Sequence, residues 1–183
     1  MVMRLPSLAR SVVITCTFAA CTWLWPVVVA AHSVPEQSVF DATGEIKNPF
    51  TVPDGVLAVM KTDPFVQENL RDQGIPSDQI PKSWFAASIV HLARSRESDV
   101  VLIGKGPLVG ANVTQFWILR PTGHGYELLL QATGLVLSIK EGRLNGYRDI
   151  SVGAATAVQV TTVLFRFDGH RYRAHRQSTI PIV

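Results

Sequence analysis

Apolar residues recur at two different spacings along this chain. Between Pro53 and Gly74 they fall three and four positions apart, which is typical of a helix packed on one face. From Ala86 onward they alternate with polar residues, which is typical of half-buried strands. The change of period predicts a short helical start followed by a β-rich body.

Two start signals divide the helical segment. The first helix is predicted to open at Pro53-Asp54-Gly55 and to run through Lys61. The second begins where Asp63 caps a helix with Pro64 in its first turn, and Gly74 ends it. The apolar face of the second helix is expected to cover the sheet.

The alternating body predicts eight strands, separated by short connections that contain Gly, Pro or Asn. They are Ala87–Leu92, Asp99–Gly104, Gln115–Arg120, Tyr126–Gln131, Leu135–Lys140, Tyr147–Val152, Val158–Phe167 and His170–Arg176. No gap between them is long enough for a crossover helix, so the sheet is predicted to be antiparallel.

The predicted fold class is therefore α+β, with two short N-terminal helices packed on an antiparallel sheet of about eight strands, closed as a sandwich, a barrel or a blade-like unit. Residues 1–31 form a predicted signal peptide, 32–52 a flexible lead-in and 53–183 a single α+β domain. Within the last hairpin, Asp168-Gly169 predicts a two-residue turn that pairs Arg166 with Arg171.

The first 31 residues carry the features of an export signal. Arg4 and Arg10 precede a nearly uninterrupted apolar stretch, and Ala30-Ala31 offers a small-residue cleavage site. The chain is therefore predicted to be secreted or periplasmic. A retained membrane anchor and lipidation at Cys21 are the two alternatives.

Cleavage changes the composition of the remaining chain. Two of the seventeen basic residues leave with the signal, and the fourteen acidic residues all stay, so the net charge falls from +3 to +1. Both cysteines, Cys16 and Cys21, also leave, and with them any disulfide or thiolate site. Neither a nucleic-acid partner nor a cofactor is expected.

Several runs of the mature chain resemble a group of uncharacterised bacterial secreted β-rich proteins. The runs include Gly106-Pro107-Leu108-Val109-Gly110-Ala111-Asn112, Asn145-Gly146-Tyr147-Arg148-Asp149-Ile150 and Phe165-Arg166-Phe167-Asp168-Gly169-His170-Arg171-Tyr172. The resemblance implies architecture and carries no reaction. In such proteins an acidic loop similar to the FG-GAP/VCBS calcium loop follows the first strand.

Here that loop is degenerate. His91, Ala93, Ser95 and Arg96 occupy its first four specified positions, and only Asp99 matches the pattern. Calcium prefers six to eight oxygen ligands, so no metal site is expected at this loop.

Basic side chains gather on the final hairpin, where Arg166, Arg171 and Arg173 are the candidate ligand-binding residues. They are either splayed into solvent or share an anion. Residues 32–110 hold seven basic and ten acidic groups, whereas 111–183 hold eight and four, so the same charges could equally pair internally.

These features favour a non-catalytic binding or interaction domain of the bacterial cell envelope, with an envelope protein or a glycan as its partner. The alternative is a secreted enzyme. Its most concrete version is a copper-brace oxidoreductase, in which His32, as the new N-terminus, would bind copper together with His91.

Overall fold

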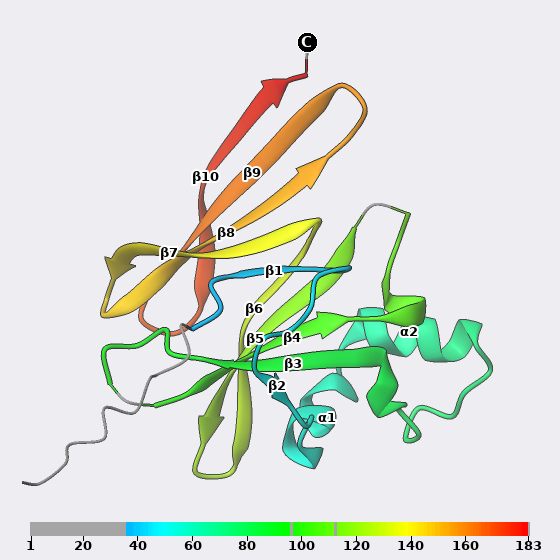
Figure 1. Cartoon of the computed structure of the whole chain (residues 1–183). Coiled ribbons are helices and arrows are strands. Elements are labelled where there is room, and N and C mark those ends of the chain that lie inside the picture. The colour runs from blue at the N-terminus through cyan, green and yellow to red at the C-terminus, as the bar shows by residue number, and fades with distance from the viewer. Residues whose placement is uncertain (1–35, 96, 112, 183) are drawn as a thin grey trace, which may run out of the picture. The chain divides into compact units, whose positions relative to one another are not determined.

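The computed structural model describes residues 36–95, 97–111 and 113–182, and these form a β-rich structure (Figure 1). The strands are β1 (Val39–Asp41), β2 (Pro49–Phe50), β3 (Phe85–Val90), β4 (Asp99–Gly104), β5 (Thr114–Thr122), β6 (Gly125–Gly134), β7 (Val136–Leu144), β8 (Tyr147–Ala155), β9 (Gln159–Phe167) and β10 (Tyr172–Pro181). The helices are α1 (Asp54–Met60) and α2 (Pro64–Asp72), with short 3₁₀ turns η1 (Lys82–Trp84) and η2 (Gly106–Leu108).

The strands divide into two antiparallel sheets of five. The central sheet has the order β2-β3-β4-β5-β6, and the C-terminal sheet has the order β1-β7-β8-β9-β10. The predicted antiparallel, β-rich architecture is thus confirmed.

The predicted α+β fold class, with two N-terminal helices on one sheet of about eight strands, is wrong. Ten strands form two sheets, and β1 and β2 precede the helices. These two strands are three and two residues long, too short to show a period in the sequence. They exist because Phe40 packs in the core opposite Leu137, and because Phe50 pairs with Ala87.

The central sheet is buried on both faces. One face packs against the C-terminal sheet, where Val101 and Ile103 of β4 join Ile150 of β8 in one core cluster. The other face packs against α1 and α2, where Val100 and Leu102 of β4 join a second cluster. Figure 1 shows the helices on the side of β3 and β4 away from β9 and β10. Residues 100–103 of β4 are therefore all apolar, as expected for a strand covered on both sides.

A buried carboxylate connects the helices to the central sheet. Asp63 caps α2 by accepting a hydrogen bond of 3.0 Å from the backbone N–H of Val66, and Pro64 opens the helix as predicted. Its second oxygen accepts a hydrogen bond of 2.8 Å from the indole N–H of Trp117 in β5. One side chain thus ends the interhelical turn and fixes α2 over the sheet.

The two C-terminal hairpins differ in their turns. Asn145 and Gly146 have φ values of 49° and 84° and form a two-residue turn between Leu144 and Tyr147. The predicted two-residue turn at Asp168-Gly169 is wrong, because β9 and β10 begin to pair at Phe167 and Tyr172. The turn there has four residues, 168–171.

The reason for the longer turn lies in packing and turn hydrogen bonds. It places Phe167 and Tyr172 opposite each other, only 3% and 4% exposed, with their ring centroids 5.6 Å apart. Tyr147 stacks on Phe167 at 4.1 Å. The Asp168 carboxylate accepts hydrogen bonds from the backbone N–H groups of His170 and Arg171, which satisfies the turn.

Within the described ranges, neither helix is long and apolar enough to cross a membrane.

Candidate functional site

The outer face of the C-terminal sheet, here called the open face, is the most prominent candidate site. Its apolar residues belong to neither core cluster, in contrast to both faces of the central sheet. Figure 1 shows β8, β9 and β10 side by side in this sheet. A sheet face left without a packing layer is available to solvent or to a ligand.

Strand register arranges the open face in four rows across β8, β9 and β10. The rows are Asp149, Arg166 and Arg173; Ser151, Leu164 and Arg176; Gly153, Thr162 and Ser178; and Ala155, Val160 and Ile180. Strand β7 adds Val136, Ser138 and Lys140. The face therefore changes along the strands from basic, through hydroxyl-bearing, to apolar.

Small side chains hollow the centre of the open face. Ser151, Gly153 and Thr162 occupy the middle of the rows. Two adjoining hollows of about 270 and 410 Å³ lie over them, and both are lined by Lys140, Ser151 and Thr162. Hydroxyl groups can donate and accept hydrogen bonds, so the floor suits a polar ligand.

The basic end begins with two arginines that face each other. Arg166 and Arg173 are direct cross-strand partners, an arrangement that repels unless anions intervene. Arg166 Nε donates to Asp149 Oδ2 at 3.2 Å, and Arg173 Nε donates to Asp168 Oδ2 at 3.1 Å. Arg166 also lies 3.0 Å from the ring of His175. Each arginine therefore has its own carboxylate.

The Asp149 site is built closely around its carboxylate. Asp149 is 5% exposed, and a Cβ placed on Gly142 would lie 2.7 Å from its Oδ2 atom. Any larger residue at position 142 would displace the carboxylate that holds Arg166. Arg166 is thus a positioned group.

The turn also settles where Arg171 lies. Its backbone N–H and C=O both bond to Asp168 within the turn, so it is not a strand residue opposite Arg166. The backbone N–H groups of Arg171 and His170, and then the Arg173 side chain, hold the pKa of the Asp168 carboxyl well below its usual range. Of the three predicted binding residues, the structure places Arg166 and Arg173 together and Arg171 in the adjoining turn.

Sequence reasoning missed two further cations of the open face. Lys140 of β7 and Arg176 of β10 line one hollow together with Ser178. Among the residues placed by the structure, neither side chain forms an ion pair. The bulge in β10 between Ala174 and Arg176 turns Arg176 onto the same face as Arg173. A regular strand would place Arg173 and Arg176 on opposite faces, so the sequence pattern does not predict this position for Arg176.

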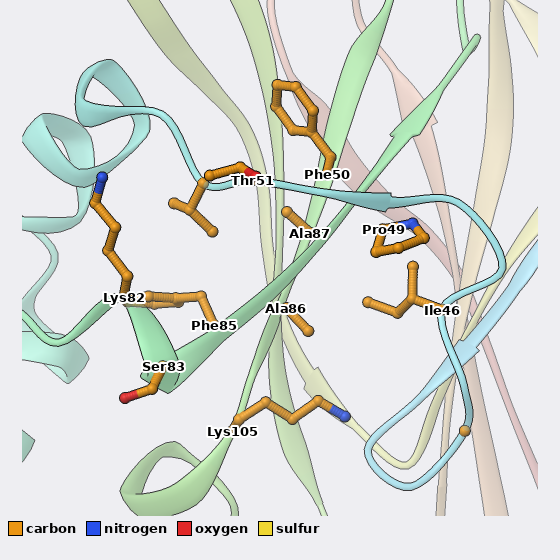
Figure 2. Close-up of a pocket in the computed structure, with 12 residues that line it drawn as sticks. Ile46, Pro49, Phe50, Thr51, Lys82, Ser83, Phe85, Ala86, Ala87 and Lys105 are labelled. Atoms are coloured by element: carbon orange, nitrogen blue, oxygen red, sulfur yellow. The ribbon is translucent and has the colours of Figure 1, made fainter.

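A hollow of about 580 Å³, larger than either hollow of the open face, lies beside β2 and the start of β3 (Figure 2). Figure 2 shows Lys82 and Lys105 at its border, pointing in different directions. Lys82 pairs with Asp54 at 2.9 Å, and Lys105 donates to the carbonyl of Ala42 at 2.7 Å. Both ammonium groups thus hold neighbouring segments in place, so this hollow is the weaker candidate.

A buried acid lies where β4 begins. Asp99 is 1% exposed, and burial raises its pKa to about 6 although the Leu92 N–H and the Arg120 charge act in the opposite direction. Its Oδ1 atom accepts no hydrogen bond from the described residues. Arg120 lies over the rings of Tyr147 and Phe167, at 5.3 and 5.4 Å from their centroids. Asp99 is therefore a structural group with an unusual titration.

The predicted copper site and the degenerate calcium loop involve residues outside the open face, chiefly His32 and His91. Among the described residues, no three His, Cys, Asp or Glu side chains gather as a metal site. His32 lies outside the described residues, so the copper alternative stays a prediction. His91 is placed, and its ring nitrogen Nδ1 lies 3.4 Å from Glu36.

Comparisons with protein families, with curated proteins and with solved structures found no match for this chain. The resemblance to secreted proteins with a calcium-type loop accordingly stays a prediction.

Proposed function

We propose that this protein is an exported binding domain of the bacterial cell envelope and that its open face holds an anionic glycan. The observation that supports this most strongly is the hollowed, uncovered face of the C-terminal sheet. It combines a hydroxyl floor with two cations, Lys140 and Arg176, that have no anionic partner among the residues placed by the structure. The predicted export signal supports a location in the cell envelope.

The chemistry of the face favours a charged, hydroxyl-rich ligand. Arg176 can bind a carboxylate through two parallel N–H groups, and Lys140 can approach the same anion as a point charge. Ser151, Thr162 and Ser178 can exchange hydrogen bonds with sugar hydroxyls. Aromatic residues are absent from the four rows, so recognition would depend on charge rather than on ring stacking.

The dimensions of the face favour a chain-like ligand over a small molecule. Four strands about 4.8 Å apart span roughly 14 Å, and four rows spaced two residues apart along a strand span roughly 20 Å. The two hollows share residues and so form one depression. An elongated carbohydrate with carboxylate groups fits this shape and charge.

Titration calorimetry with polygalacturonate tests the proposal. Substituting Lys140 and Arg176 together by Ala should weaken binding about tenfold or more, because each charge-assisted hydrogen bond contributes about 1.5 kcal/mol or more. Arg71→Ala removes a matched arginine from α2 and should leave binding unchanged. Added salt should weaken binding by the wild-type protein.

Three results would contradict the proposal. They are equal binding of neutral dextran, unchanged affinity in the double variant, and preferential binding of polyglutamate, which would indicate a protein partner instead of a glycan.

A further inference from the structure

His91 and Ser98, which lie in the loop predicted to be a degenerate calcium loop, form a row of three groups together with Glu36. Ser98 Oγ lies 3.3 Å from His91 Nε2, and His91 Nδ1 lies 3.4 Å from Glu36 Oε1. The serine and the carboxylate thus contact the two different nitrogens of one imidazole. This is the order in which an acid orients a histidine and the histidine activates a hydroxyl.

The hairpin between β3 and β4 explains why His91 and Ser98 meet. Val90 and Asp99 are the last pair of the ladder, so the next residues on each strand, His91 and Ser98, flank the loop at equal distance. Leu92 is fully buried, and its N–H donates to the buried Asp99. The two reacting residues therefore stand on an anchored part of the loop.

Glu36 is fixed by two separate groups. One oxygen, Oε1, accepts a hydrogen bond from the backbone N–H of His91 itself. The other lies 3.8 Å from Nη1 of Arg148. Arg148 is held in turn, because its Nε donates to the carbonyl of Lys140 at 3.0 Å and its backbone N–H donates to the carbonyl of Leu92 at 2.9 Å. The carboxylate is consequently positioned before any substrate arrives.

We propose that Ser98, His91 and Glu36 form a nucleophilic relay that cleaves short acyl esters. His91 Nε2 takes the hydroxyl proton as Ser98 Oγ bonds to the ester carbonyl carbon. The ester C–O bond then breaks, and the leaving alkoxide takes the proton from His91. Water, activated by the same histidine, hydrolyses the acyl-serine and releases a carboxylic acid. Glu36 accepts the Nδ1–H of the histidine and stabilises the transient imidazolium.

The relay is open to solvent, which determines its substrate class. The His91 side chain is 51% exposed and the Glu36 side chain 31%. The three residues line none of the hollows described above, so the relay would accept ester groups on large molecules as readily as free esters. None of the three relay residues belongs to the open face, and Lys140 takes part only through its backbone carbonyl, so the relay can be tested independently of glycan binding.

Two measurements on the exported domain test the relay: the rate of p-nitrophenyl acetate hydrolysis, and labelling by diisopropyl fluorophosphate followed by peptide mass mapping. We expect the label on Ser98. Ser98→Ala and His91→Ala should each lower the rate by about tenfold or more, since a positioned general base contributes at least that factor. Glu36→Gln should give a smaller loss, because the amide still accepts the Nδ1–H but carries no charge.

Matched controls separate the relay from ordinary surface chemistry. Ser95→Ala removes a serine from the same loop, and His124→Ala removes an exposed histidine elsewhere, and neither should change the rate or the label. The proposal is overturned if the label lies on another residue, if Ser98→Ala retains the wild-type rate, or if His124→Ala lowers the rate as much as His91→Ala. Because all five substituted side chains are exposed or partly exposed, circular dichroism should show unchanged folding.

Discussion

At the scale of single residues, Asp99 shows how burial changes the chemistry of an ordinary side chain. It begins β4 and is buried there, and its charge acts on the nearby hydroxyl groups of Tyr147 and Tyr172. Desolvation raises the pKa values of both tyrosines as well, so the whole end of the core disfavours negative charge. The positive charge of Arg120 lowers the pKa of Asp99 only in part, because the effect of burial is larger.

The raised pKa of Asp99 predicts that stability depends on pH. Its folded pKa of about 6 exceeds the unfolded value of 3.8, so its favourable contribution is complete below about pH 4 and is lost as the pH rises through 6. Asp99→Asn should therefore raise the free energy of unfolding at pH 7.5 by about 1–3 kcal/mol and change it little at pH 4. Urea denaturation at both pH values measures this.

Asp78→Asn, which changes an exposed acid, is the control and should show no such difference between the two pH values. A loss of stability at pH 7.5 in Asp99→Asn would mean that the ionised carboxylate is favourably paired with Arg120.

At the scale of elements, the structure depends on a few side chains that serve two elements at once. Asp168 satisfies the last turn with one carboxylate oxygen and holds Arg173 with the other. Asp63 does the same for α2 and β5, and its residue is 4% exposed, so both of its bonds are shielded from water. In each case the sequence indicates that the aspartate belongs to a turn or a helix cap. It does not reveal the second partner, which is Arg173 for Asp168 and Trp117 for Asp63.

Asp63→Ala should destabilise the protein by about 2–4 kcal/mol. The loss of the helix cap costs about 1 kcal/mol, and the buried indole N–H of Trp117, left without an acceptor, costs a further 1–3 kcal/mol. Trp117→Phe in the Asp63→Ala background should remove much of the second cost. Guanidinium denaturation of the two single variants and the double variant measures the coupling.

The Thr62→Ala substitution removes an exposed hydroxyl next to this cap and serves as the control, with an expected loss below about 1 kcal/mol. If Asp63→Ala costs no more than this control, Asp63 does not connect α2 to the sheet in the way proposed.

At the scale of the whole molecule, charge is distributed unevenly along the chain. Residues 111–183, which include strands β7 to β10 of the C-terminal sheet, hold eight basic and four acidic residues. Two of those acids, Asp149 and Asp168, neutralise Arg166 and Arg173, which leaves Lys140 and Arg176 to give the open face its positive character. This distribution, more than any single residue, supports an anionic partner.

The predicted export signal leads to a prediction for the whole chain. Protein recovered from its native host should be found outside the cytoplasm and begin at or near His32, because residues 4–31 combine a basic start, an apolar centre and a small-residue exit. Intact mass spectrometry of the secreted or periplasmic fraction measures this. A mass that retains Met1, or a lipid on Cys21, would indicate a membrane-held protein instead.

The sequence by itself determined the features that depend on neighbouring residues. The start of α2 follows from Asp63 and Pro64, and the range of β4 follows from its apolar run. The start of β8 at Tyr147 was also predicted, although the strand continues to Ala155, three residues beyond the predicted end. Candidate chemistry was partly visible too: the predicted binding residues of the final hairpin included Arg166 and Arg173, but they left out Arg176 of the same hairpin and Lys140 of β7. Such local signals act over one turn of helix or one strand, and they need no distant partner.

Only the tertiary structure decided the rest. The division into two sheets depends on β1 and β2, which are too short to pair without β7 and β3. The register of the last hairpin depends on burying Tyr172 against Phe167, and that gain outweighs the local preference for a two-residue turn. The Glu36–His91 contact joins residues 55 positions apart. Each of these features rests on contacts between distant segments, whose free energy appears only when the segments meet.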